Sequence, residues 1–199
     1  QNRIIQYLKN KNIKTLGHIS QAPLALPTHL IKKKYSPSKM FVNGIDQKDC
    51  LIKLGWKKKN IITIPSTRFL DIKKNFSNQI FFPGSIKSVS QILKSLEFLI
   101  INHKLNLKKF SIRNHPAVFN SKTHKTLEFR INKLKKKYKS NFKNNSFLNN
   151  YSIFIGASGS IIEALERNCK VIQITEVPIL DFYSNYFWKS VKAKKINDN

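Results

Sequence analysis

The chain has 199 residues, of which 41% are hydrophobic and 11% aromatic; this composition supports a real core and argues against a disordered chain. Its 37 basic and 10 acidic residues give a formal charge of +27, a balance that often indicates a polyanionic partner. No apolar run is long enough to cross a bilayer, and no spacing of cysteine and histidine is typical of a zinc site. Cys50 and Cys169 lie in apolar segments and are predicted to be free thiols.

Three explanations of the positive charge are open. Only 5 of the 37 basic residues are Arg, and Lys is spread along the chain together with abundant Asn and Ile, which favours the codon bias of an AT-rich genome. Attraction to an anionic membrane surface is the next explanation. Specific nucleic-acid binding is the least favoured, because proteins that read bases depend on bidentate Arg. We therefore expect no specific nucleic-acid partner.

The first third of the chain has the pattern of a β-α-β unit. Strands are predicted at Thr15–Ser20, Lys39–Gly44 and Asn60–Phe69, and a one-sided helix is predicted between the last two, over Ile45–Trp56. Such a unit favours a parallel sheet. Residues 1–70 are interpreted as the end of a Rossmann-like acceptor-side domain whose beginning is missing, and the polar residues 71–78 as a linker.

A second alternating series follows the linker and defines a second Rossmann-like domain, residues 79–199. Alternating strands and helices predict an α/β fold with parallel sheets. The expected strands are 79–84, 108–116, 151–156 and 170–175, and the expected helices are 87–104, 123–138, 160–168 and 180–191.

The turn GASGS, Gly156 to Ser160, follows one of these strands and opens a helix. In parallel sheets, ligands bind beyond the carboxyl ends of the strands. Gly156 and Gly159 allow close approach of the backbone, and the first N–H groups of the helix at Ser160 are expected to point outward, unpaired, as an anion site. The alternative is a capping box between Ser160 and Glu163. Both readings are compatible if Ser158 contacts the ligand.

Two further strand ends carry polar or small residues. The segment IRNHPA places Arg113 and His115 after one strand, and imidazole can donate a hydrogen bond to a phosphate oxygen. Gly84 and Ser85 follow another strand. Each feature alone also fits an ordinary surface loop or turn. Because the three strand ends should lie at one edge of a sheet, together they indicate a site for a phosphorylated, nucleotide-like ligand.

The second half resembles the C-terminal, donor-binding domain of GT-B glycosyltransferases, of the bacterial surface-carbohydrate and sialyltransferase-like type. The first half resembles the last β-α-β unit of their N-terminal domain. Three segments carry the resemblance in the order seen in that family: IFFPGSI, SIRNHPA and IFIGASGSIIEALERNCKVIQIT.

The resemblance implies roles for individual residues. His115 would contact a phosphate oxygen of the nucleotide. Ser158 and Ser160, with the backbone N–H groups around Gly159, would cradle the same phosphate. Glu163 would face the ribose.

The implied activity is transfer of a sugar from a nucleotide-sugar donor to a glycan or lipid-linked acceptor in the synthesis of surface polysaccharide, capsule or lipopolysaccharide. Gly84 and Ser85 would line the cleft. No cofactor and no metal are implied, since no acidic cluster is available to hold an ion. The expected location is the cytoplasm, with peripheral contact at the anionic inner membrane.

The chain departs from the family in its acidic groups. Sialyltransferase-like enzymes take their general base from an Asp/Glu-Gly motif in the N-terminal domain, whereas Asp46, Asp49 and Asp71 are not followed by Gly. His18 is the only substitute candidate. The close spacing of Glu163 and Glu166 does not support a retaining mechanism.

Two other functions stay open. The same architecture serves nucleotide-sugar 2-epimerases, although these need several acids and histidines in the cleft. A non-catalytic module that binds nucleic acid or another polyanion is the other alternative, with the patch RINKLKKKYK over residues 130–139 as its best support. A solvated helix face is the favoured interpretation of that patch.

Overall fold

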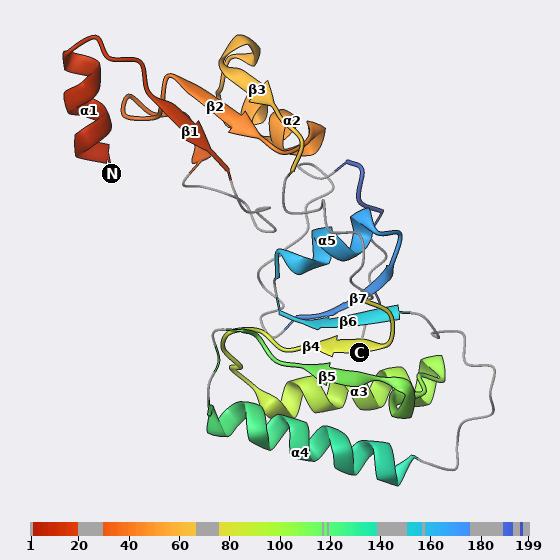
Figure 1. Cartoon of the computed structure of the whole chain (residues 1–199). Helices are drawn as coiled ribbons and strands as arrows, with labels where there is room; N and C mark the ends of the chain where they lie inside the picture. The colour runs from red at the N-terminus through yellow and green to blue at the C-terminus, as the bar shows by residue number, and fades with distance from the viewer. Residues whose placement is uncertain are drawn as a thin grey trace. The chain divides into compact units, whose positions relative to one another are not determined.

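A computed structural model describes residues 2–19, 30–66, 76–116, 118, 120–138, 151–156, 158–175, 189–192 and 196. The chain forms two compact units (Figure 1), one comprising Gln1–Asp71 with Asp181–Lys195 and the other Ile72–Leu180 with Ile196–Asn199. Each unit contains a sheet of parallel strands among helices, so the predicted α/β class is confirmed. Within the described residues, no helix combines the length and the apolar character needed to cross a membrane.

The division differs from the predicted domains at the C-terminal end. The sequence assigned everything from residue 79 to the second domain, whereas Asp181–Lys195 groups with the first unit. One contact within the first unit joins these two parts of the chain: the backbone N–H and the hydroxyl of Ser190 donate to the Asp46 carboxylate at 3.3 and 2.9 Å. The predicted helix over residues 180–191 lies mostly outside the described residues.

The first unit contains a three-stranded sheet that is parallel, as the β-α-β pattern predicted, and its strand order is β1-β2-β3. Alternate strand residues such as Met40 and Val42 point into a core shared with Leu51 and Trp56. An N-terminal helix precedes the sheet and was not predicted. The elements are α1 (Asn2–Asn10), β1 (Leu16–His18), β2 (Lys39–Val42), α2 (Ile45–Lys53), η2 (Lys58–Asn60) and β3 (Ile61–Thr63).

The second unit contains a four-stranded parallel sheet in the order β5-β4-β6-β7. In register, Phe81 of β4 pairs with Arg113 of β5 and with Phe154 of β6. The elements are β4 (Gln79–Phe81), α3 (Val89–His103), η4 (Leu107–Lys109), β5 (Ser111–Arg113), α4 (Lys122–Lys137), β6 (Tyr151–Ile155), α5 (Ser160–Glu166) and β7 (Lys170–Ile174).

Strand periodicity separates the two faces of the second sheet. One face carries alternate residues of β4, β6 and β7, and α3 and α4 cover it to form the main core. Figure 1 shows α5 on the other side of the strands. That face carries stacked aromatic rings, with the centroids of Phe81 and Phe154 4.3 Å apart and those of Phe76 and Phe81 5.4 Å apart.

The strand order places a topological switch point between β4 and β6. From β4 the chain proceeds to β5 on one side, and after α4 it returns to β6 on the opposite side of β4. In open α/β sheets, ligands bind in the crevice outside the carboxyl ends of the strands at such a point. The residues that follow β4 and β6 are therefore the place to look for a site.

Candidate functional site

Three turns meet at the carboxyl edge of the second sheet. A Cβ atom built on Gly84, after β4, would lie 3.8 Å from Nδ1 of His115, which follows β5. A Cβ atom on Gly156, after β6, would lie 3.7 Å from Cβ of Pro83. The structure thus brings together the ends of β4, β5 and β6, as the sequence predicted for this edge. Ser85 and His115 are both exposed there.

The turn after β4 is held by a residue that the sequence analysis missed. Nε2 of His124, in the first turn of α4, lies 2.8 Å from the carbonyl oxygen of Pro83. Since a carbonyl only accepts, Nε2 carries the proton, and Nδ1 is left to accept from the Ser121 hydroxyl at 2.9 Å. His124 is only 5% exposed. Its place one turn before Leu127, on the apolar stripe of α4, was the signal that it would be buried.

Gly156 adopts a conformation that glycine favours. Its φ is +71°, a left-handed value that costs a residue with a Cβ atom free energy. Its N–H donates to the carbonyl of Ile174 at 2.7 Å, and its carbonyl accepts from the Gln173 side chain at 3.2 Å. Both partners are in β7, so this neighbouring strand fixes the start of the turn.

The GASGS turn differs from both predictions made for it. The N–H of Ser160 donates to Oγ of Ser158 at 3.2 Å, and the N–H of Ile161 donates to the Ser158 carbonyl at 3.1 Å. These two groups are not outward-pointing, unpaired donors. The capping box is also absent: Gly159 is the N-cap of α5, with no side-chain cap bond, and Ser160 is already the first helical residue. Ser158 closes the turn instead.

Glu163 lies on the buried side of α5, with 7% of its surface exposed. Its carboxylate accepts from the guanidinium of Arg167, one turn later, at 3.1 Å. A pair of this kind satisfies a buried carboxylate. The contact of Glu163 with a ribose stays a prediction. To make it, the Glu163 carboxylate would have to bind the ribose while it is paired with Arg167, or give up that pair.

Arg113 ends β5 beside the aromatic stack. The guanidinium carbon lies 5.5 Å from the ring centroid of Phe81, within the range of a cation–π contact. The contact orients Arg113 along the face that carries α5, on the strand that leads to His115. Two cationic or potentially cationic side chains therefore come from the end of β5, a charge that suits an anionic ligand.

In the first unit, His18 at the end of β1 contacts Asn43 at the end of β2. Nε2 of His18 lies 3.2 Å from Oδ1 of Asn43, whose amide nitrogen donates to the carbonyl of Ile19 at 3.1 Å. The Asn43 oxygen therefore accepts, so Nε2 of His18 carries a proton and Nδ1 is the nitrogen that can act as a base. Gln47 fixes the same corner by accepting from the Asn43 N–H at 2.8 Å.

In the part of the chain that the structure describes, no group of three or more His, Cys, Asp or Glu side chains is arranged to hold a metal ion. The two cysteines are free, one in each unit, with Cys50 buried and Cys169 half-buried.

Comparisons with protein-family models, with curated proteins and with solved structures found no match. The geometry of the two sheet edges is therefore the basis for a proposal about function.

Proposed function

We propose that this chain is a glycosyltransferase of the GT-B type, which transfers a sugar from a nucleotide-sugar donor to a glycan or lipid-linked acceptor. The second unit would bind the donor nucleotide at the carboxyl edge of its sheet. The first unit would belong to the acceptor side. The acceptor class proposed is a bacterial surface polysaccharide, made at the cytoplasmic face of the membrane.

The observation that carries this proposal is the meeting of three turns at the switch point of the second sheet. A Cβ atom built on Gly84 would meet the ring of His115, and one built on Gly156 would meet Pro83, so the turns after β4, β5 and β6 share one edge. Small residues there leave room for the backbone to approach a ligand. Open α/β sheets bind their ligands at this position.

The side chains at this edge suit a diphosphate. His115 and Arg113 supply donors that match phosphate oxygens, and the hydroxyl of Ser85 lies in the same turn as Gly84. Ser158 and Ser160 follow β6, where Ser158 orders the turn. Fixed donors around a leaving phosphate stabilise the charge that grows on it as the glycosidic bond breaks, and this term is often the largest in such reactions.

The first unit offers one candidate for the base that deprotonates the acceptor hydroxyl. The hydrogen bond from Nε2 of His18 to Asn43 leaves Nδ1 of His18 as the basic nitrogen. Because His18 is exposed at the end of β1, a hydroxyl can reach it from solvent.

Calorimetry and thermal-shift measurements with CMP, CDP, UDP and GDP, at low and moderate salt, test the donor site. We expect saturable binding of one nucleotide that depends little on salt. His115→Ala should weaken this binding by about tenfold or more, the loss expected for a charge-assisted hydrogen bond to phosphate. His103→Ala is the matched control, since His103 lies at the end of α3 and contacts the Phe98 ring.

The proposal fails if no nucleotide binds, or if His115→Ala keeps the full affinity of the parent chain. Binding only to a random-sequence oligonucleotide, lost as salt rises, would instead support a polyanion-binding module. With a binding nucleotide in hand, incubation with its sugar derivatives separates transfer from 2-epimerisation. Transfer moves the sugar to an acceptor hydroxyl and leaves the free nucleotide, whereas 2-epimerisation gives a sugar with inverted configuration at C2.

A further inference from the structure

The two helices that cover the same face of the second sheet differ sharply in charge. α4 contains six Lys and one Arg against a single Glu, a net charge of +6, whereas α3 contains one Lys and one Glu. Seven of the 16 residues of α4 are basic, compared with 37 of 199 in the whole chain. A general bias towards Lys acts on both helices alike, so it does not explain a concentration on one of them.

The charge of α4 gathers on its outer face. Residues three or four apart lie on one side of a helix. A stripe of this spacing runs along α4 on the side opposite the buried His124, Leu127 and Ile131, and every member of it is exposed. We call it the α4 stripe, and it consists of Lys122, Lys125, Phe129, Lys133 and Lys136.

Phe129 is at the centre of the α4 stripe and is 60% exposed. The ammonium of Lys133 lies 4.8 Å from the centroid of its ring. An isolated exposed apolar residue needs no explanation. Here the aromatic ring is flanked on both sides by lysines of the same face, with Lys122 and Lys125 before it and Lys133 and Lys136 after it.

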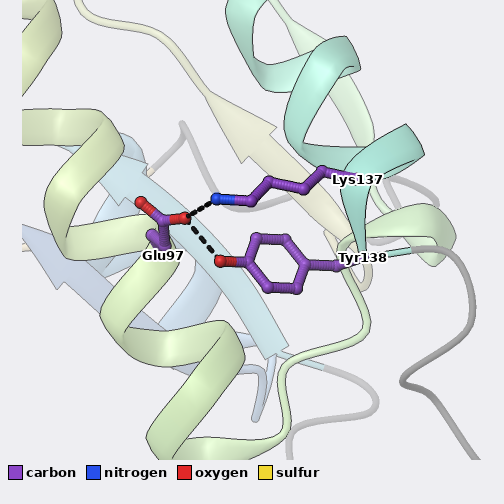
Figure 2. Close-up of polar contacts among 3 residues, drawn as sticks. All are labelled: Glu97, Lys137 and Tyr138. Atoms are coloured by element: carbon purple, nitrogen blue, oxygen red, sulfur yellow. Dashed lines mark hydrogen bonds and ion pairs between the residues drawn. The ribbon is translucent and has the colours of Figure 1, made fainter.

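In the part of the chain that the structure describes, no carboxylate forms an ion pair with a lysine of the stripe. Glu97 of α3 accepts from Lys137 at 2.7 Å and also from the hydroxyl of Tyr138, so it is engaged with the C-terminal end of α4 (Figure 2). Glu128 is the only acid in α4 itself, and it is half-buried beside the stripe. The four lysines of the stripe therefore keep their charge toward solvent.

We propose that the α4 stripe docks on an anionic phospholipid surface, with its lysines among the headgroups and Phe129 inserted at the interface. The helix is about 24 Å long, so the stripe presents an extended row of charge to a membrane surface. Lysines near such a surface each add attraction, and an aromatic ring between them buries apolar area at the headgroup level. This inference is independent of the proposed function.

Features of the stripe favour lipid over nucleic acid. All four of its cations are Lys, whereas base recognition relies on the fork geometry of Arg. Single-stranded nucleic acid is held in a groove with several aromatic rings on which successive bases stack. The α4 stripe has one ring, on the convex surface of a helix.

The experiment is flotation of the full chain with phosphatidylcholine vesicles, with and without about one-third phosphatidylglycerol. The test variant is K122Q/K125Q/K133Q/K136Q. The control K57Q/K58Q/K108Q/K109Q removes four other exposed lysines and leaves the net charge equal to that of the test variant. A second variant, Phe129→Ser, removes the ring and leaves every charge in place. Far-UV circular dichroism checks that all variants are folded.

We expect the parent chain to bind anionic vesicles only. Its affinity for them should fall on the order of tenfold or more in the test variant and no more than about twofold in the control. Phe129→Ser should weaken it about threefold or more, because the lost term is apolar burial. The proposal is overturned if the parent chain does not bind anionic vesicles, or if both quadruple variants lose binding equally. It is also overturned if the test variant keeps full binding to anionic vesicles and loses only its binding to a random-sequence oligonucleotide.

Discussion

His124 donates a hydrogen bond from Nε2 to the carbonyl of Pro83, although the two residues lie 41 positions apart in the chain. The bond joins the first turn of α4 to the turn that follows β4. Pro83 in turn lies beside Gly156, the first residue after β6, where a Cβ atom built on the glycine would be 3.7 Å from Cβ of Pro83. The buried His124 thus fixes the turn after β4 in the candidate donor site, although it lies in α4 and not at a strand end.

His124→Ala should therefore destabilise the second unit. The change removes two hydrogen bonds, leaves the Pro83 carbonyl without its partner and opens a small cavity, at a cost of about 2–4 kcal/mol. Urea unfolding compares the variant with His103→Ala, for which we expect a loss below about 1 kcal/mol because His103 is half-buried at a helix end. Equal unfolding midpoints for the two variants would contradict a structural role for His124.

Gly156→Ala should destabilise the chain by about 1–2 kcal/mol, because the alanine must adopt the left-handed φ of +71°. Gly44→Ala is the comparison variant, for which we expect a smaller loss, set only by the lower preference for Ala at the N-cap of α2. Gly44 has an extended backbone with φ of −174°, and no atom lies within 4 Å of a Cβ built there. Thermal denaturation of both variants is the measurement, and a Gly156→Ala variant as stable as Gly44→Ala would show that the turn relaxes.

Replacement of the two serines of the GASGS turn separates a capping box from the turn seen here. Ser158→Ala should cost about 0.5–1.5 kcal/mol, because Oγ of Ser158 accepts from the N–H of Ser160. Ser160→Ala should be close to neutral, since Ser160 is the first helical residue and provides no cap. Denaturant unfolding measures both changes, and the reverse order of costs would restore the capping box.

The Glu97 contact between α3 and α4 should weaken in acid. Hydrogen bonds from Lys137, and secondly from Tyr138, lower the pKa of Glu97 (Figure 2). The stabilisation is present above the pKa that Glu97 has in the unfolded chain and is lost as the pH falls through the lower pKa of the folded state. Because the pair is on the surface, screening by solvent keeps its contribution to folding stability small.

The measurement is urea unfolding of the parent chain and of Glu97→Gln across mildly acidic pH. The difference between them should shrink as the pH falls. Glu128→Gln serves as the control, because it also removes one negative charge, but from α4 and not from the Glu97 contact. A difference for Glu97→Gln that does not change with pH would contradict the assignment.

Cys50 should be the less reactive of the two thiols. Burial raises the pKa of Cys50 to about 11, against a smaller lowering by the charge of Lys53. An unfolded thiol loses its proton at lower pH, so this site lowers folding stability as the pH rises from about 9 toward 11. Labelling with iodoacetamide at neutral pH, followed by mass spectrometry, should modify Cys169 first. Faster modification of Cys50 would show that its segment opens.

The sequence by itself determined the class of the fold and the positions of most elements. Apolar runs such as those around Ile80 and Ile153 alternate with helical patterns, and periodicity within one element is a local property that a sequence displays. It also identified the turns after the strands, because glycine, serine and histidine at strand ends stand out from the apolar residues before them. Figure 1 shows these elements in the predicted succession.

Only the tertiary structure decided the strand order β5-β4-β6-β7, and with it the switch point between β4 and β6 and the closeness of Gly84 to His115. Strand order depends on packing between segments far apart in the chain, for which a local pattern carries no signal. The same reason applies to His124, whose partner Pro83 is on another element. It applies less to Ser158 and Glu163, whose partners are close in sequence. At the GASGS turn the sequence left a capping box and an unpaired anion site open, because serine and glycine can satisfy a helix start in more than one local way. The structure shows neither, since Gly159 is the N-cap of α5 and Ser158 accepts from the N–H of Ser160.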